Sequence, residues 1–132
     1  MLVSQVSPLR RVLLADALVS GATGLLMFGG AGFLASLLDL PQPLLSYAGL
    51  VLLLYGALVA WVGTRENLQR PAVWTVILAN ALWTVDSIVL LLSGWVAPNA
   101  LGFAFVIAQA LVVALFAVMQ SSGIRRMSAT IA

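Results

Sequence analysis

The sequence predicts an all-α membrane protein, a bundle of four transmembrane helices made of two tandem hairpins. Of its 132 residues, 63% are hydrophobic and 8% are charged, whereas a soluble domain averages about 25% charged residues. Short positive segments stay in the cytoplasm, so each apolar stretch between two such segments should cross the membrane twice. Both termini are then cytoplasmic. The six basic residues form three such segments, at Arg10, Arg11, Arg65, Arg70, Arg125 and Arg126.

Each predicted helix is bounded by residues that end or begin helices. Gly30 weakens the first helix at its outer end, and residues 31–40 could extend that helix or form a separate one in the outer interface. Pro41 then forces a turn, and Pro71 suits the first turn of the third helix. A single membrane domain, residues 1–132, therefore contains helices at about residues 12–30, 44–63, 72–94 and 100–120.

The two hairpins resemble each other, which predicts a parallel internal repeat. At an offset of 64 residues, Asp16, Ser20, Thr23 and Gly30 align with Asn80, Thr84, Ser87 and Gly94. At an offset of 54, Gly56, Ala60 and Gly63 align with Ala110, Ala114 and Ala117. Two units that enter the membrane in the same direction are related by an axis along its normal; chance similarity among leucine-rich and alanine-rich helices is the alternative. The small residues also predict helix-packing faces, because they let backbones approach closely in lipid.

The residue types that are missing restrict the chemistry of this chain. It has no cysteine and no histidine, and its six basic residues are all arginines. Disulfides, Cys/His metal sites, histidine ligation of haem and lysine Schiff bases are therefore excluded. No paired carboxylates or nucleophile–base arrangement is visible either. We accordingly expect neither an enzyme nor a cofactor. Because the arginine positions are explained by topology, we expect no nucleic-acid partner.

Asp86 is the most unusual residue in the predicted membrane interior. It lies about 12 Å below the outer end of the third helix at 1.5 Å per residue, and an aspartate near a helix centre costs about 2.5–3.5 kcal/mol on insertion scales. It could couple a proton or cation to transport, or it could be a protonated residue that fixes helix packing. Other polar residues at similar depths complete a candidate intramembrane site, which comprises Asp86, Gln109, Tyr55, Asn80, Thr84, Ser87, Ser20 and Thr23.

Asp16 receives a different interpretation, because it lies only about 6 Å inside the start of the first helix. Arginine side chains can extend toward the interface from nearby helix ends. The sequence therefore predicts an interfacial ion pair between Asp16 and a cytoplasmic arginine, with Arg10, Arg11, Arg65 and Arg70 as candidates.

Several stretches carry a resemblance to other membrane proteins: RRVLLADALVSGATGLL, YAGLVLLLYGALVAWVGTR, ANALWTVDSIVLLLSGW and the closing GIRR. They resemble a group of small bacterial four-helix integral membrane proteins to which no function is assigned. The resemblance covers nearly the whole chain and implies a multi-pass protein of the bacterial inner membrane. Small multidrug transporters share the size and helix count, but they place a glutamate in the first helix, which this sequence lacks.

Two functions are consistent with these observations. The first is a non-enzymatic oligomeric module, either an accessory or scaffold subunit or a binder of lipid or another hydrophobic ligand. Its partners would be membrane lipid, further copies of itself or another membrane protein. The alternative is a small proton- or cation-coupled transporter or channel that uses Asp86.

Overall fold

The computed structural model describes residues 2–131, with side chains described from residue 8 to residue 126. The described chain is entirely helical apart from its connections. Four of its helices are long and apolar enough to cross a membrane, which confirms the predicted all-α class and the four apolar spans. The helices are α1 (Leu2–Gly29), α2 (Ala31–Leu38), α3 (Gln42–Thr64), α4 (Arg70–Leu92) and α5 (Ala100–Ile131).

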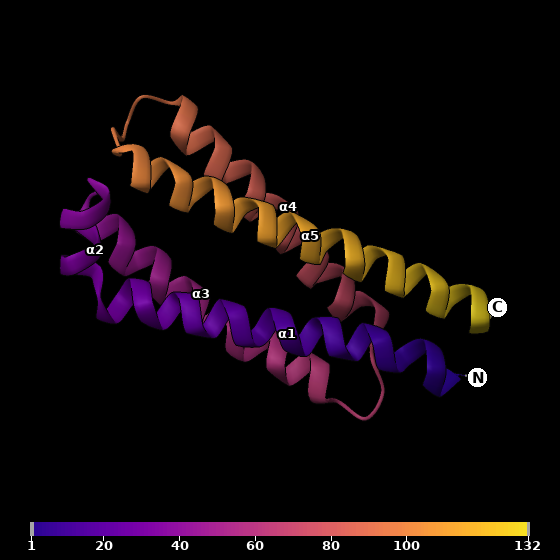
Figure 1. Cartoon of the computed structure of the whole chain (residues 1–132). Helices are drawn as coiled ribbons and strands as arrows, with labels where there is room; N and C mark the ends of the chain where they lie inside the picture. The colour runs from indigo at the N-terminus through magenta and orange to yellow at the C-terminus, as the bar shows by residue number, and fades with distance from the viewer. Residues whose placement is uncertain (1, 132) are drawn as a thin grey trace.

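The four long helices form two antiparallel pairs (Figure 1). α1 packs along α3, α4 packs along α5, and α1 also runs beside α5, whereas α3 and α4 barely touch. No backbone contact joins α1 to α4 or α3 to α5 within the described chain, so these helices lie diagonally opposite each other. The bundle is therefore closed on three sides and open between α3 and α4.

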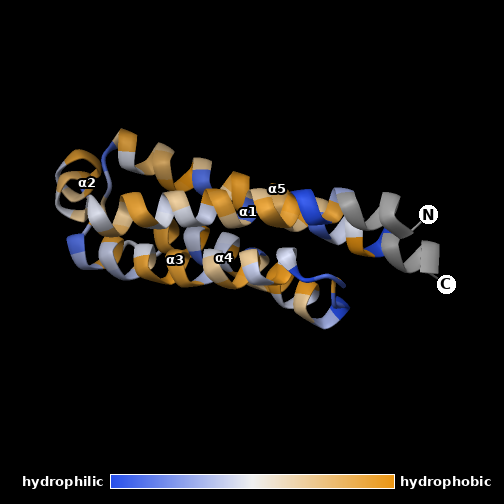
Figure 2. Ribbon diagram, turned by 90° about the horizontal axis from the view of Figure 1, so that it is seen from below, coloured by the Kyte–Doolittle hydropathy of each residue, from blue (hydrophilic) through white to orange (hydrophobic). Residues whose placement is uncertain are grey.

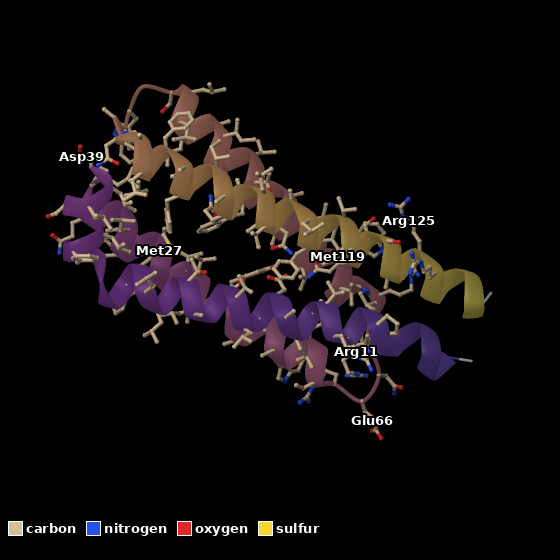
Figure 3. The ribbon with its side chains drawn as sticks, in the orientation of Figure 1. Arg11, Met27, Asp39, Glu66, Met119 and Arg125 are labelled. Atoms are coloured by element: carbon tan, nitrogen blue, oxygen red, sulfur yellow. The ribbon has the colours of Figure 1, made fainter. Side chains whose placement is uncertain are left out.

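Both termini and the α3–α4 connection lie at one end of the bundle, and α2 lies at the other (Figure 1). Figure 3 shows Arg11, Glu66 and Arg125 at the first end and Asp39 at the second. Polar residues gather toward the ends of the ribbon and apolar residues predominate between them (Figure 2). This distribution is the one expected of helices that cross a bilayer.

Residues Ala31–Leu38 form a separate helix, α2, rather than an extension of α1. Gly30 interrupts the helical backbone between them, and Asp39 ends α2 in the left-handed conformation with φ 54°. Aspartate is one of the few residues other than glycine that adopt this conformation, because its short polar side chain can bond locally. α2 is then tied to the start of α5, because the Asn99 side chain donates to the Leu37 carbonyl at 2.8 Å.

α1 begins earlier and α5 ends later than the sequence predicts. Gly123, eight residues before the end of α5, lies inside this helix rather than after it. The two extensions meet, because a Cβ atom on Gly123 would lie 3.0 Å from the Leu9 side chain. Leu9 and Ile124 are both fully buried there. Mutual burial of apolar side chains thus explains why the helices continue past the predicted membrane boundary.

α1 and α3 approach each other through glycines. A Cβ atom on Gly49 would lie 2.8 Å from the Gly24 carbonyl oxygen, and one on Gly24 would lie 2.7 Å from the Gly49 carbonyl oxygen. Further along, a Cβ atom on Gly56 would lie 3.0 Å from the Gly21 nitrogen. Gly56 and Gly63 are buried against α1, so the predicted packing role of these two residues is confirmed. Small residues allow this close backbone approach in lipid.

Two apolar clusters fill the bundle, one toward each end. The cluster at the arginine end includes Leu13, Val59 and Val76. The cluster toward α2 includes Met27, Leu52 and Val106. Buried polar residues lie between these clusters: Asp16, Ser20, Asn80, Ser87 and Gln120.

Candidate functional site

A hydrogen-bonded network centred on Asp16 joins all four long helices. Asp16 on α1 is 1% exposed, and its hydrogen-bond partners among the described side chains are all uncharged. Its Oδ2 atom accepts from Asn80 Nδ2 on α4 at 2.8 Å and from Gln120 Nε2 on α5 at 2.7 Å. Its Oδ1 atom accepts from the Ser20 hydroxyl at 3.0 Å. The carboxyl group therefore accepts three hydrogen bonds from neutral side chains in the middle of the bundle.

The remaining bonds of the network fix the orientation of both amides. Asn80 Nδ2 also donates to Gln120 Oε1 at 2.9 Å. The Tyr55 hydroxyl on α3 lies 3.0 Å from Asn80 Oδ1, to which it donates, and 3.1 Å from the Val76 carbonyl oxygen. Rotating the Asn80 amide would turn its oxygen toward Asp16 and lose both donated bonds. Every buried side-chain nitrogen and oxygen in the described chain has a partner, as a buried polar group in lipid requires.

This arrangement corrects the predicted ion pair at Asp16. No arginine contacts the Asp16 carboxyl among the described side chains, and Arg11 is exposed. Arg65 stacks on the Trp61 ring, with 4.8 Å between the guanidinium carbon and the ring centroid. Arg70 donates to the Ile124 carbonyl at 3.4 Å. The helical register turns Asp16 toward the bundle interior, where amide donors from α4 and α5 meet it.

Arg10 bonds to the C-terminal end of α3 instead. Its guanidinium donates to the carbonyl oxygens of Gly63 at 2.5 Å, Arg65 at 2.6 Å and Glu66 at 3.2 Å. The last carbonyls of a helix lack partners within the helix, and a cation there also interacts favourably with the helix dipole. Arg10 therefore acts as a cap for α3 supplied by α1.

A second polar group lies closer to α2 and joins α4 to α5. Gln109 Oε1 accepts from the Trp83 indole nitrogen at 2.7 Å, and Gln109 Nε2 donates to the Ser87 hydroxyl at 2.9 Å. Ser87 in turn donates to the Trp83 carbonyl at 2.8 Å. These bonds hold the Trp83 ring in a fixed orientation. They also provide hydrogen-bond partners for both the oxygen and the nitrogen of the Gln109 side chain. Asp86, which the sequence predicted at a similar depth, is not one of these partners.

Asp86 belongs to neither polar group. Its side chain is exposed, and among the described side chains it has no hydrogen-bond or ion-pair partner. It lines two adjoining cavities between α3 and α4, and both cavities are also lined by Val51 and Trp83. One cavity has a volume of about 330 Å³ and reaches Tyr55 and Asn80 of the central network.

The other cavity has a volume of about 580 Å³ and extends toward the α2 end, where Tyr47 and Trp95 line it. Together the two cavities form a groove along the open side of the bundle, which we call the α3–α4 groove. A smaller cavity of about 230 Å³ lies between α1 and α5 and is lined by Asp16, Thr23 and Gln109.

The structure thus divides the predicted polar site into parts. Ser20, Tyr55 and Asn80 join Asp16, while Ser87 joins Gln109. The Thr84 hydroxyl donates to the Asn80 carbonyl of its own helix at 2.9 Å. Thr23 lines the cavity between α1 and α5.

Gln120 is a network member that sequence reasoning missed, because it falls at the predicted end of the fourth helix. Gln109 precedes it by 11 residues, which is about three helical turns. This spacing places both glutamines on one face of the helix. The spacing could therefore have predicted from the sequence that Gln120 also faces the bundle interior.

Comparisons of the chain with protein-family models, curated proteins and solved structures gave no match. Function therefore has to be argued from the site itself. Every buried polar side-chain atom of the central network is hydrogen-bonded, so its geometry suits a structural element that fixes the relative positions of four helices. The α3–α4 groove has apolar walls, an unpartnered carboxyl and access from the side, which are features of a site for a ligand.

Proposed function

We propose that this chain is a non-enzymatic membrane module that binds a hydrophobic or amphipathic ligand from the bilayer in the α3–α4 groove. The observation that carries the proposal is the divergence of α3 from α4 in a bundle whose other neighbouring helices pack together. Ligand pockets typically have volumes of about 300–1,000 Å³ and mostly apolar walls. The two cavities of the groove, about 330 Å³ and 580 Å³, fall in this range.

The two helices that form the sides of the groove are held in place, and polar groups lie where the groove meets the central network. α3 is held against α1 by glycine contacts, and α4 is held to α5 and α1 through Gln120, Asn80 and Asp16. Neither helix can close the groove without breaking these contacts. Tyr55 and Asn80 supply hydrogen-bonding groups where the groove meets the central network. A pre-formed site of this kind binds without a large ordering cost.

We expect Val51→Trp to abolish retention of the native ligand. Val51 is exposed and lines both cavities, so an indole ring there would occupy the groove. The measurement is native mass spectrometry of protein released from its own membrane in mild detergent. Wild-type protein should carry a discrete lipid or small-molecule mass, and Val51→Trp should not. Val85→Trp is the matched control, because Val85 is equally exposed on α4 and lines none of the described cavities. Equal retention by wild type and Val51→Trp would contradict the proposal.

The same spectra report the oligomeric state. We propose that the module acts as a homo-oligomer or with a membrane-protein partner, as an accessory or scaffold subunit. Large apolar side chains cover the outside of the bundle, among them Leu18, Phe33 and Leu92. In lipid such surfaces are available to other helices as well as to acyl chains.

We further propose that the protein resides in the bacterial inner membrane with both termini in the cytoplasm. All six arginines belong to the end of the bundle that holds the termini and the α3–α4 connection. Short loops rich in arginine stay on the cytoplasmic side. The bacterial membrane rests on the resemblance described above.

Cysteine labelling in intact cells tests this orientation. The sequence contains no cysteine, so an introduced one is the only target for a maleimide. A membrane-impermeable maleimide should label Ala97→Cys, in the exposed α4–α5 connection, and should label Asn67→Cys, in the α3–α4 connection, only after lysis. The reverse pattern would place the termini outside.

The tandem repeat is also part of this proposal. Its support is that Asp16 and Asn80, which align at the offset of 64 residues, bond directly to each other across the diagonal of the bundle. An axis along the membrane normal would pass between them. Under such an axis the α1–α3 pair corresponds to the α4–α5 pair.

Transport coupled to Asp86 has less support from the geometry. Among the described side chains, no hydrogen bond connects Asp86 to Tyr55, Asn80 or the rest of the Asp16 network. The groove offers a site for a ligand beside Asp86, whereas the buried polar groups at the centre of the bundle are already bonded to one another. Binding is therefore the function that these contacts favour.

A further inference from the structure

We propose that the α2-side half of the α3–α4 groove selects a hydrophobic organic cation, in which one positive charge is attached to an apolar body. This inference rests on the proposed function and names the ligand class for the same groove. Its three observations are the unpartnered carboxyl of Asp86, the aromatic residues that surround it, and the absence of any basic group from the cavity lining.

Asp86 lies too far from the arginines of its own chain to be neutralised by them. On α4, Arg70 is 16 residues away, or about 24 Å at the helical rise. The other arginines lie near the start of α1, just after α3 or near the end of α5, which are at the end of the bundle where α4 begins (Figure 1). A carboxyl group inside a membrane normally pairs with another group or lines a functional pathway. The partner of Asp86 must therefore come from outside the described chain.

The cavity around Asp86 is built from the residues that stabilise organic cations. Tyr47, Trp83 and Trp95 line it together with the carboxyl, and the rest of the wall is apolar except for Ser87. Aromatic rings attract ammonium groups through the negative face of the ring, and this attraction increases when the cation is desolvated. The apolar wall would accommodate the body of the ligand.

Trp83 is held in place before any ligand arrives. Its indole nitrogen donates to Gln109 at 2.7 Å, and Gln109 is fixed by Ser87. A ring with a fixed orientation loses little conformational freedom on binding. The hydrogen bond to Gln109 thus makes Trp83 a rigid part of the cation site.

The lining also argues against a zwitterionic phospholipid as the occupant. A phosphate group is bound most strongly by charged donors such as arginine, and the cavity lining contains neither arginine nor lysine. Charge complementarity therefore favours a ligand with a cationic group and no accompanying anion.

The test compares a cation with its neutral isostere. Full-length protein in the nonionic detergent dodecyl maltoside is titrated with phenylbutyl-trimethylammonium, and with the analogue in which carbon replaces the nitrogen, by isothermal titration calorimetry. The cation should bind more tightly than the isostere. Asp86→Asn should weaken cation binding at least about tenfold, and Tyr47→Leu should weaken it severalfold, while both leave the isostere unaffected.

Asp39→Asn is the matched control. It removes another carboxyl near the α2 end, but Asp39 does not line the described cavities, and asparagine tolerates its left-handed backbone conformation. This variant should bind the cation as wild type does.

Three results would overturn the inference in distinguishable ways. Equal binding of the cation and the isostere, both blocked by Val51→Trp, would leave the proposed function standing with a neutral ligand. No binding of either compound, together with no retained ligand in native mass spectra, would remove both proposals. A change of oligomeric mass in Asp86→Asn without cation binding would instead assign this face to a contact between copies of the chain.

Discussion

Asn80→Asp should destabilise the bundle by about 3 kcal/mol or more. The new carboxyl group would lie where the Asn80 amide now donates to Asp16 at 2.8 Å and to Gln120 at 2.9 Å. Two carboxylates at about this distance cannot both be ionised, and a protonated carboxyl group can replace only one of the two hydrogen bonds that the amide donates. The free energy of unfolding in mixed micelles, followed by far-ultraviolet circular dichroism, measures the effect. Asn67→Asp, in the exposed connection between α3 and α4, is the matched control and should change stability by less than about 0.5 kcal/mol.

The exchange of both residues tests the network more sharply than either single variant. Asp16→Asn combined with Asn80→Asp keeps one carboxyl and one amide at the centre of the bundle. Gln120 can serve both arrangements by rotating its own amide. We expect the double variant to recover at least about 2 kcal/mol relative to Asn80→Asp, which is a coupling energy typical of residues in direct contact. If the double variant is as unstable as Asn80→Asp alone, Asp16 and Asn80 do not meet in the folded protein.

The sequence predicts the spans well because a bilayer imposes strong and local constraints. A helix that crosses it needs about 20 apolar residues, and charged residues are rare away from its ends. The arginines and the prolines at positions 41 and 71 therefore locate the helices to within a few residues, except where α1 and α5 extend beyond their predicted ends to bury Leu9 and Ile124. That extension depends on a contact between the two ends of the chain, which no local pattern contains.

The position of Asp16 could not be predicted by the same reasoning. Its depth in the first helix is a local property, but its partners, Asn80 and Gln120, are 64 and 104 residues away. Which face of α1 meets α4 and α5 depends on the packing of all four helices. Arginines seemed the natural partners because they are near in sequence, yet the carbonyls at the end of α3 occupy Arg10 instead. Charge alone therefore gave the wrong partner.

Asp86 shows the opposite situation, in which sequence reasoning identified the residue and the structure supplied its surroundings. Its rarity within a membrane span marks it as unusual. Only the divergence of α3 from α4 shows that it borders a groove rather than a packed interface. The same reasoning from depth grouped Gln109 with Asp86, although Gln109 is bonded to Trp83 and Ser87. Depth along a helix thus identifies neighbours only when the helix faces are also known.

Gly49→Leu should have an effect of similar size, about 3 kcal/mol of lost stability, through a different mechanism. A Cβ atom on Gly49 would lie 2.5 Å from the Phe28 backbone nitrogen and 2.8 Å from the Gly24 carbonyl oxygen. Both atoms belong to the α1 backbone, so no side-chain rotation can relieve the clash, and α1 must move away from α3. Gly49→Ala should already cost about 1–3 kcal/mol, the usual range for overpacking a tight interface. Unfolding in mixed micelles again provides the measurement.

Gly21→Ala is the control that separates crowding from the loss of a glycine. Gly21 lies in the same helix as Gly24, but a Cβ atom there would meet nothing within 4 Å. Alanine is the better helix former by about 1 kcal/mol, so this variant should be neutral or slightly more stable. Because α1 carries Asp16 and α3 forms one wall of the groove, separating the two helices should also disturb ligand binding. Gly49→Leu should therefore lose the retained ligand along with its stability, whereas Gly21→Ala should keep both. A stable, ligand-loaded Gly49→Leu protein would mean that α1 and α3 do not pack through their glycines.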